Sequence, residues 1–341
     1  MNYSGKGRLF AGKYRQGGAF MAKKVLTGIS GGVDSAVTAL LLLEAGYAVT
    51  GCFLRLHDAQ NSEEAEQSAL DTAKKLGIKL ITADFRAEFK KNVTEYFVSE
   101  YRKGRTPNPC VQCNPTVKFR ALKKTAEENG MEYIATGHYA KIYRDEKTGL
   151  CAVMASPSKK DQSYFLYRLP QEILQKTVFP LGNFISKDEI REIGKKAGFE
   201  AAEKKDSQEI CFIPDNDYAE YISKNAGIPA KPGAFLDTAG NRIGTHAGII
   251  RYTVGQRKGL GAFGEPRYVK YINAADNTVT LCRAEERYAL TARAEQLFWA
   301  FGQPPTPEKE YGVKIRSTAK AVPARLTLDE DGMTVHFASP V

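Results

Sequence analysis

The sequence has neither an apolar run long enough to cross a membrane nor enough cysteine for a secreted disulfide scaffold. Its longest apolar stretch, residues 37–45, is interrupted by Thr38 and Glu44. That is far short of the roughly 20 apolar residues a membrane-spanning helix needs. Six cysteines in 341 residues fit a reducing compartment better than a disulfide-stapled chain. We therefore expect a cytoplasmic protein without a membrane partner.

Acidic residues are in deficit. Lys and Arg number 49 against 39 Asp and Glu, which gives a formal net charge of +10. Such an excess favours a polyanionic partner such as nucleic acid, because counterion release from phosphates drives binding. An ordinary soluble protein can carry the same charge. With 43% hydrophobic and 26% charged residues, the composition is that of a globular chain, which excludes disorder along most of its length.

The first twenty residues lack apolar periodicity and the apolar centre of a signal peptide. They are rich in Gly, Lys and Arg, and an apolar strand begins shortly after Met21. We expect residues 1–20 to be a disordered extension. A basic arm that touches RNA is the alternative.

Strands and helices alternate from residue 21 onward. The apolar patterns predict strands over 24–29, 47–56, 78–83 and 132–135, and helices over 34–45, 62–77, 89–101 and 116–129. This alternation predicts an α/β fold with a parallel sheet and helices on both of its faces. Further on, a hairpin is predicted over 140–143 and 151–155. Ser186 and Glu189 form the capping box of a helix that ends near Gly198.

The pattern changes at Cys211, after which short alternating segments and frequent glycines predict β-rich structure. Alternating runs occur at 278–282, 313–316 and 333–337. We predict a catalytic domain over 21–205, a small central domain over 206–276 and a C-terminal β-barrel-like domain over 277–341.

A glycine-rich segment, Gly-Ile-Ser-Gly-Gly-Val-Asp-Ser at residues 28–35, joins the first strand to the first helix. Gly31 and Gly32 allow unusual backbone angles and the close approach of a ligand. The helix start offers N–H groups to an anion. The lysine of the kinase-type phosphate loop is missing, and Asp34 beside phosphates implies a bridging metal ion. A tight structural turn is the alternative.

A second segment, Gly-Arg-Thr-Pro-Asn-Pro-Cys-Val-Gln-Cys-Asn at residues 104–114, leads into the helix predicted from Thr116. Cys113 would lie just before that helix, with Lys118 and Arg120 near it. A helix N-terminus and nearby cations both lower a thiol's pKa, so we expect a reactive thiolate at Cys113.

Cys211 lies at the junction between regions of different pattern, in Asp-Ser-Gln-Glu-Ile-Cys-Phe-Ile at residues 206–213. Loops at such junctions often carry function. Cys52, Cys151 and Cys282 have no comparable surroundings, and we interpret them as small buried hydrophobic residues.

Taken in order, these segments resemble a known family. Residues 30–35 resemble the pyrophosphatase loop of enzymes that split ATP into AMP and pyrophosphate. The chain from Lys24 to about Gly261 resembles the bacterial tRNA-specific 2-thiouridylases (tRNA-uridine 2-sulfurtransferases). The matching segments are 28–35, 104–114 with Lys118 and Phe119, 135–139, 160–166, 207–213 and 252–261.

The resemblance implies an adenine-nucleotide alpha-hydrolase-like domain that binds ATP with Mg²⁺. It assigns ATP contacts to Gly28, Ile29, Ser30, Gly31, Gly32, Val33, Asp34, Ser35, Leu54 and Gly137. It assigns contacts with a tRNA for Glu, Gln or Lys to Asn108, Pro109, Cys110, His138, Lys160, Asp161, Gln162, Arg316 and Ser317.

The implied reaction begins when the 2-oxygen of a flipped wobble uridine attacks the α-phosphorus of ATP. Cys211 receives sulfur as a persulfide from a sulfur-relay protein or a cysteine desulfurase. Cys113 is the nucleophile that forms a disulfide bond with Cys211 and frees sulfide, or else assists direct attack. Sulfur then displaces AMP.

The chain departs from the family's pattern in two places. Cys110 stands where the family has an Asp assigned to acid–base chemistry, and the reference pKa of a thiol is about 8.5. Cys110, Cys113 and Cys211 could instead hold an iron–sulfur cluster or zinc, or act as a redox pair. We place the persulfide route ahead of the cluster. Arg316-Ser317 stands in the region of an Arg-Tyr-like tRNA contact.

Two rival functions stay open. Another adenylating synthetase with the same loop would need neither Cys113 nor Cys211. A non-catalytic RNA-binding module would release no pyrophosphate in the presence of tRNA.

Overall fold

The computed structural model describes residues 22–59, 62–204, 210–213, 217–226, 230–317 and 319–341. The extension expected over residues 1–20 lies outside them. The described residues divide into two compact units, one within 1–93 and 110–214 and the other within 94–109 and 215–341. Each unit is described by itself below.

The first unit is built on a five-stranded parallel sheet with the order β3-β2-β1-β4-β7. This is an order of doubly wound nucleotide-binding folds. Its strands are β1 (Lys24–Gly28), β2 (Ala48–Arg55), β3 (Leu80–Asp84), β4 (Tyr133–Ala135) and β7 (Thr177–Val178). The sequence predicted the first four. β7 was missed because two residues carry no periodic signal.

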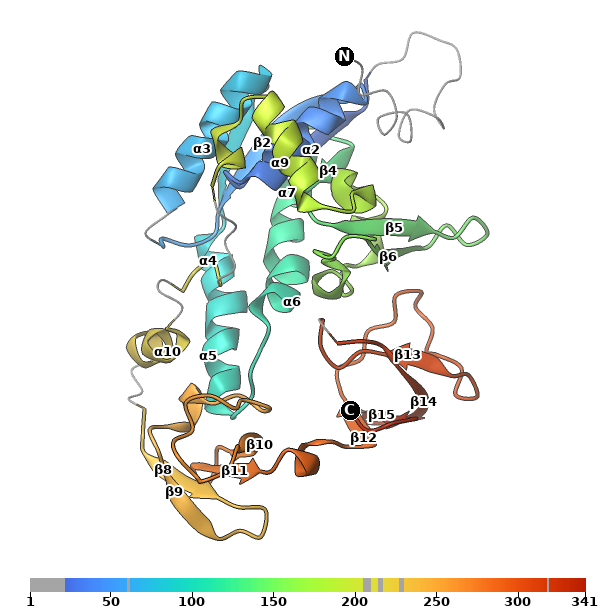
Figure 1. Ribbon diagram of the computed structural model, residues 1–341. Helices are drawn as coiled ribbons and strands as arrows, with labels where there is room; N and C mark the ends of the chain where they lie inside the picture. The colour runs from blue at the N-terminus through green and yellow to red at the C-terminus, as the bar shows by residue number, and fades with distance from the viewer. Residues whose placement is uncertain (1–21, 60–61, 205–209, 214–216, 227–229, 318) are drawn as a thin grey trace. The chain divides into compact units, whose positions relative to one another are not determined.

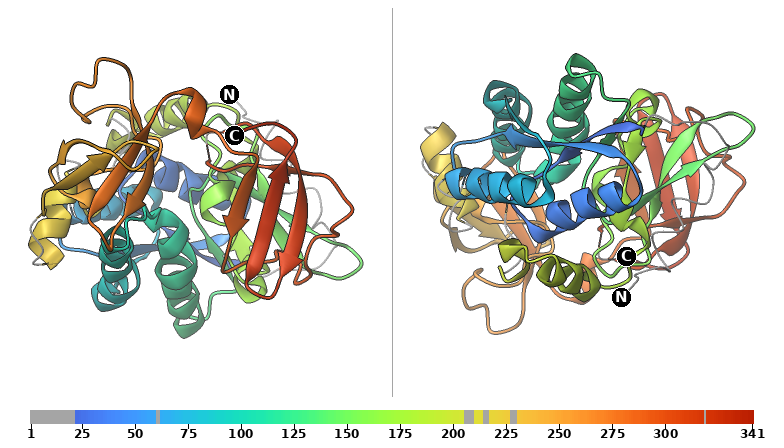
Figure 2. Two further views of the ribbon diagram at one scale, coloured as in Figure 1. Left: turned by 90° about the horizontal axis from the view of Figure 1, so that it is seen from below. Right: turned by 90° about the horizontal axis from the view of Figure 1, so that it is seen from above.

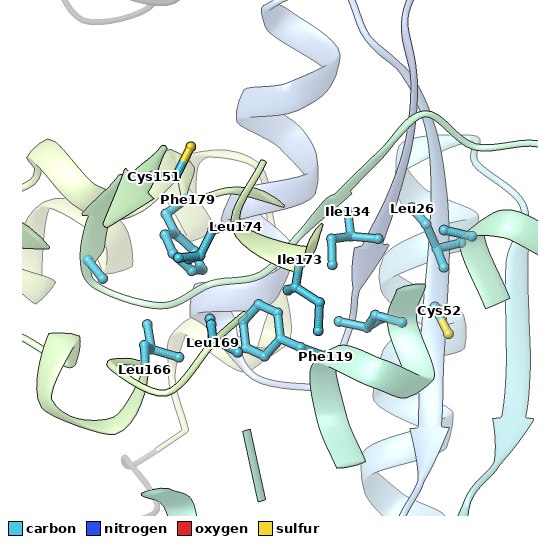
Figure 3. Close-up of a cluster of buried hydrophobic side chains, with 13 residues drawn as sticks. Leu26, Cys52, Phe119, Ile134, Cys151, Leu166, Leu169, Ile173, Leu174 and Phe179 are labelled. Carbon is cyan, nitrogen blue, oxygen red and sulfur yellow. The ribbon is translucent and has the colours of Figure 1, made fainter. Parts of the chain in front are cut away.

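Helices cover both faces of this sheet, as predicted (Figure 1). Consecutive strand residues point to opposite faces, so Val25 packs with α2 (Val33–Glu44) and α3 (Ser62–Leu76). Leu26 packs on the other face, against α7 (Phe119–Glu128) and α8 (Gln171–Leu174). Figure 3 shows the second cluster, with Phe119 and Ile173 between the helices and the sheet.

Two helical runs begin earlier than the sequence predicted. The run expected from Phe89 starts at α4 (Arg86–Phe89) and continues through the π-helical η1 (Lys90–Thr94) into α5 (Glu95–Arg102). The run expected from Thr116 starts at α6 (Pro109–Cys113) and continues through the π-helical η2 (Asn114–Lys118) into α7. Pro109 is the first residue of its run, where proline is well tolerated. Cys113 therefore lies inside a helical run, and the prediction that it precedes a helix start was wrong.

A hairpin and a capped helix complete the first unit. The predicted hairpin is confirmed as β5 (Ala140–Arg144) paired antiparallel with β6 (Cys151–Ala155). The predicted capping box is confirmed at Ser186 and Glu189, which begin α9 (Lys187–Lys196). Short 3-10 segments are η3 (Ser163–Phe165), η4 (Pro180–Asn183) and η5 (Glu200–Ala202).

α9 packs against α2 in a cluster that includes Val33, Val37 and Ile190. Gly194 makes this close packing possible, because a Cβ atom there would lie 2.8 Å from Cγ2 of Val33. The contact fixes α9 relative to the glycine-rich loop that precedes α2.

The second unit is strand-rich, as predicted, and contains two four-stranded sheets (Figure 2). One has the order β10-β11-β8-β9 and the other β12-β15-β14-β13. The strands are β8 (Gly233–Leu236), β9 (Arg242–His246), β10 (Tyr268–Asn273), β11 (Thr278–Cys282), β12 (Thr291–Ala294), β13 (Tyr311–Val313), β14 (Val322–Asp329) and β15 (Gly332–Phe337). Short 3-10 segments are η7 (Ile249–Arg251) and η8 (Glu285–Arg287).

The strand pairing bears on the predicted boundary after residue 276. β11 pairs with β10 and β8, so a boundary there falls within one sheet. The helix α10 (Tyr218–Ala226) was not predicted. Its Tyr218 stacks on Tyr101 of α5, with ring centroids 5.4 Å apart. None of the described helices is both long and apolar enough to cross a membrane.

Replacing Gly194 with Val should destabilise the first unit by about 1–3 kcal/mol, because overpacking at a close helix contact forces the helices apart. The midpoint of thermal unfolding, followed by circular dichroism, measures the loss. Lys195→Val is the neighbouring control, since it places the same side chain at an exposed position of the helix, and Gly194→Val itself gains helix propensity, so its loss reports packing. Equal shifts for the two variants would contradict the packing role of Gly194.

Candidate active site

The backbone of the glycine-rich loop is held in shape by α3. Gly31 has a φ of +79°, and a Cβ atom there would lie 2.5 Å from the carbonyl oxygen of Ala65. The hydroxyl of Ser68 donates a hydrogen bond of 2.9 Å to the carbonyl oxygen of Gly31. Glycine is therefore required at this position for both its backbone angle and its lack of a side chain.

The side chains of the loop divide between the interior and the surface. Ile29 and Val33 are buried in the core, whereas Ser30 and Gly32 are exposed. The hydroxyl of Ser35 donates to the carbonyl oxygen of Gly32 at 2.8 Å and accepts from the amide of Ser30 at 3.1 Å. In this state the Ser35 hydroxyl serves the turn itself, and the exposed backbone around Ser30 and Gly32 faces solvent.

Two other residues predicted for the nucleotide lie on neighbouring strands. Leu54 is the penultimate residue of β2 and is half-buried. Gly137 follows β4, and a Cβ atom there would lie 2.9–3.1 Å from backbone atoms of Asp34 and Ser35. Parallel strands end at one edge of their sheet, which is where doubly wound folds bind ligands. The structure thus brings the loop, Leu54 and Gly137 to this edge.

Two side chains without a predicted role contact Asp34. Its Oδ1 atom accepts a hydrogen bond of 2.8 Å from the hydroxyl of Tyr139, and its Oδ2 atom lies 3.0 Å from Nζ of Lys187. The capping box at Ser186 marks the helix start that carries Lys187. No local pattern reveals that this start meets a loop so distant in sequence.

The three cysteines of interest lie within electrostatic range of one another in the first unit. Cys110 and Cys211 are exposed, and Cys113 is buried. The Cys211 thiol interacts electrostatically with Lys118, Cys113 and Cys110. All six cysteines of the chain are free thiols in this structure.

Burial makes both predicted catalytic thiols weaker acids than usual. It raises the pKa of Cys113, while Lys118 opposes that effect. Burial by the surrounding protein also raises the pKa of Cys211 to about 12, although part of the residue reaches the surface, and Lys118 again opposes it. The expectation of a lowered pKa at Cys113 was wrong, because desolvation outweighs the nearby positive charge.

The segment that carries Cys211 is anchored by its neighbour Phe212. The buried ring of Phe212 packs edge-on against the ring of Phe89, with centroids 5.4 Å apart. The ring of His57 also packs against Phe89, with centroids 5.6 Å apart. Phe89 has no sequence signal of this role, because an apolar residue on a helix is usually part of a core.

His138 is enclosed by aromatic rings. It lies 5.7 Å from the ring of Phe119 and 6.1 Å from that of Phe179, and its Nδ1 atom is 2.7 Å from the hydroxyl of Thr136. Burial, and secondarily Lys118, holds the pKa of His138 well below its usual value. The ring is therefore neutral at physiological pH.

Residues 160–162 form a loop after β6 whose side chains have different surroundings. Lys160 is exposed. Asp161 accepts hydrogen bonds from the amide of Ser156 at 2.8 Å and the hydroxyl of Ser163 at 2.7 Å. Gln162 accepts one from the amide of Tyr139 at 3.0 Å. Asp161 and Gln162 therefore shape this loop and tie it to the segment after β4.

The remaining predicted tRNA contacts belong to the second unit. Asn108 is exposed and Pro109 is buried. The guanidinium group of Arg316 donates a hydrogen bond of 2.9 Å to the carbonyl oxygen of Val254, and Ser317 is exposed.

Metal ions were predicted at two places, an iron–sulfur cluster or zinc at the three cysteines and Mg²⁺ at Asp34. Among the described residues, no three or more His, Cys, Asp or Glu side chains are grouped in a way that could hold a metal ion. The three thiols are not among such groups in this structure, and a cluster or zinc at these cysteines stays a hypothesis. The carboxylate of Asp34 is an oxygen ligand of the kind Mg²⁺ prefers when it accompanies a nucleotide.

The sheet order and the glycine-rich loop at the ends of the strands define a domain of the HUP class, which includes the pyrophosphatase-loop enzymes. Comparison agrees: residues 23–215 match the family model described as "tRNA methyl transferase HUP domain", and residues 221–283 match "tRNA methyl transferase PRC-barrel domain". The chain belongs to the family of the tRNA-specific 2-thiouridylases.

Named relatives include two tRNA-specific 2-thiouridylases. The chain is 42% identical to MnmA of Clostridioides difficile, over 93% of this chain and 91% of that one. It is 43% identical to MnmA of Acetivibrio thermocellus, over 93% and 92%. Among solved structures, the U34-tRNA thiolase NcsA from Methanococcus maripaludis with its [4Fe-4S] cluster overlaps at 18% identity and a TM-score of 0.40, over 64% of this chain and 71% of that one. Structural similarity this low says nothing about whether the present chain binds an iron–sulfur cluster.

Replacing Lys118 with Met should slow the alkylation of Cys211 at a given pH and shift its pH profile upward. The reason is that Lys118 stabilises the thiolate of Cys211, whose pKa is already raised to about 12. Iodoacetamide labelling between pH 7 and about 10, read by peptide-resolved mass spectrometry, measures the rate. Lys124→Met, on α7, is the control. An unchanged profile in Lys118→Met would refute the electrostatic role of Lys118.

Proposed function

We propose that the chain is an ATP-dependent tRNA 2-thiouridylase, a tRNA-uridine 2-sulfurtransferase. It adenylates the C2 oxygen of the wobble uridine and then replaces that oxygen with sulfur, giving 2-thiouridine, AMP and pyrophosphate. The observation that carries this proposal is the meeting of Cys113 and Cys211 beside Lys118, in the same unit as the loop at Ser30–Ser35. The named relatives, which are tRNA-specific 2-thiouridylases, support it.

ATP is assigned to the edge of the sheet where the glycine-rich loop, Leu54 and Gly137 meet. The exposed backbone of the loop and the start of α2 suit an anionic phosphate chain. Of the ten residues assigned to ATP, Ile29, Val33 and Ser35 are buried, and the apolar Ile29 and Val33 would contribute through their backbone. Asp34 is the residue that would hold Mg²⁺, which supplies positive charge to the phosphates when bound.

Adenylation uses the uridine's own oxygen as the nucleophile. A bond forms between that oxygen and the α-phosphorus, the bond from the α-phosphorus to the bridging oxygen breaks, and pyrophosphate leaves with the electron pair. The base must leave its stack to reach the site. The neutral ring of His138 can then hydrogen-bond to it without adding charge. Lys160, exposed beside the shaped loop at Asp161 and Gln162, is assigned to the RNA backbone.

Sulfur transfer uses the paired thiols. A sulfur-relay protein or a cysteine desulfurase delivers sulfur to Cys211 as a persulfide. The Cys113 thiolate attacks the Cys211 sulfur, a Cys113–Cys211 disulfide forms, and hydrosulfide leaves. Hydrosulfide adds to C2 of the adenylated base, and AMP departs with its oxygen. A thiol reductant then restores the two cysteines. Cys110, exposed beside them, is assigned to proton transfer in place of the family's carboxylate.

The second unit is assigned to tRNA recognition. It would contact a tRNA for Glu, Gln or Lys through Asn108, Pro109, Arg316 and Ser317. Its strand-rich sheets correspond to the proposed central and C-terminal domains, which follow the proposed catalytic domain over residues 21–205.

Cys113→Ser and Cys211→Ser should each abolish 2-thiouridine formation while retaining tRNA-dependent release of pyrophosphate, because adenylation precedes the cysteine chemistry. Purified protein is incubated with tRNA, ATP and a sulfur source, and nucleosides are analysed by mass spectrometry. Cys151→Ala, a buried cysteine outside the site, is the control and should remain active. Absence of 2-thiouridine with the unaltered protein, in air and under anaerobic conditions, would refute the proposal. If the unaltered protein makes no 2-thiouridine and both serine variants still release pyrophosphate, another adenylating synthetase is favoured.

The cluster alternative makes a different prediction. Protein purified without oxygen should be colourless and free of iron if persulfide chemistry operates, because that route uses Cys113 and Cys211 as thiols and not as metal ligands. Iron assay and visible absorption measure this, with Cys110→Ser as the comparison. Stoichiometric iron that is lost in Cys110→Ser, together with thiolation that depends on it, would establish the cluster route instead.

A further inference from the structure

The pairing of Lys187 with Asp34 is a feature of the loop that the proposed function leaves unused. Lys187 is the first residue of α9, and its Nζ atom lies 3.0 Å from Oδ2 of Asp34. Their side chains are 15% and 28% exposed, so the pair is partly desolvated yet open to a ligand. Most other ion pairs of this unit lie on solvated surfaces, as Lys204 and Glu64 do at 50% and 72%.

The position of Lys187 is set by rigid packing. α9 is held against α2 at Gly194, where the helices approach too closely for a side chain. The capping box at Ser186 and Glu189 fixes the first turn of α9. A flexible lysine tail is thus presented at the glycine-rich loop from a fixed helix start, which limits the positions that its ammonium group can reach.

The charges of the loop explain why a lysine is needed there. The loop itself has no lysine, unlike the phosphate loops that carry one next to their glycines. Its charged residue, Asp34, has the sign that repels phosphates. The Tyr139 hydroxyl holds the other oxygen of that carboxylate at 2.8 Å, so Asp34 can keep its orientation if Lys187 leaves.

We propose that Lys187 is the phosphate-binding lysine of this loop and acts by exchanging partners. In the nucleotide-free protein its ammonium group neutralises Asp34. When ATP binds, Lys187 turns to the β- and γ-phosphates and Asp34 is released to the metal ion that accompanies them. As the bond to the α-phosphorus breaks, negative charge grows on the departing pyrophosphate, and the ammonium group stabilises it. The inference rests on the proposed use of ATP at this loop.

The first test compares ligands with and without the outer phosphates. Lys187→Met should weaken the binding of ATP and of pyrophosphate by about 10- to 100-fold, the range of a lost hydrogen bond to a charged group. It should change the binding of AMP less than about threefold. Isothermal titration calorimetry with each ligand gives the affinities. Lys187→Arg should recover part of the loss. Lys195→Met is the matched control, because it removes the same charge from an exposed pair on the same helix.

The second test starts from a variant that keeps Lys187, so its first result does not depend on the folding of Lys187→Met. Asp34→Asn removes the repelling charge and frees Lys187, so metal-free pyrophosphate should bind at least about tenfold more tightly than to the unaltered protein. The double variant with Lys187→Met should lose that gain. Equal weakening of ATP and AMP by Lys187→Met, or a gain that survives in the double variant, would overturn the proposal. Both tests omit tRNA and sulfur, so their outcome is independent of whether 2-thiouridine forms.

Discussion

The parallel pairing of β1 with β2 and β4 is the constraint on which the rest of the site depends. It places the loop after β1, Leu54 on β2 and the segment after β4 at one edge of the sheet. The lack of a side chain at Gly137 allows the third of these to touch the backbone of the first. Because the strand register is fixed by two buried faces, a shift of one residue would move every one of these groups away from the edge.

Around the cysteines, desolvation and charge act in opposite directions. Burial raises the pKa of both Cys113 and Cys211, while Lys118 favours their thiolates. In the free enzyme burial prevails. Under the proposed mechanism a thiolate is needed only after substrate has arrived, so the resting enzyme can keep its thiols protonated. Phe212, packed on Phe89, keeps Cys211 in place through this change.

Residue patterns within short segments predicted the features that depend on those segments alone. Periodicity located β1 to β4, Ser186 and Glu189 located the start of α9, and the order of segments identified the family. Three features could not be predicted, because they depend on tertiary contacts. The desolvation of Cys113 reflects the packing around a helical run, which begins at Pro109 rather than at Thr116. The pairing of β11 with β8 joins strands separated by two others. The contact of Lys187 with Asp34 requires α9 to pack on α2, which no spacing in the sequence reveals.

The raised pKa values of the two cysteines affect how readily oxidants react with them between turnovers. Peroxide and other oxidants react with thiolates far faster than with protonated thiols, and the higher oxidation products of cysteine are irreversible. Cys211 reaches the surface, yet its pKa near 12 leaves only a trace of thiolate at neutral pH. Desolvation of the Cys211 thiol therefore lowers its reactivity toward oxidants in the resting protein, and this low reactivity follows from the same packing that holds the residue in place.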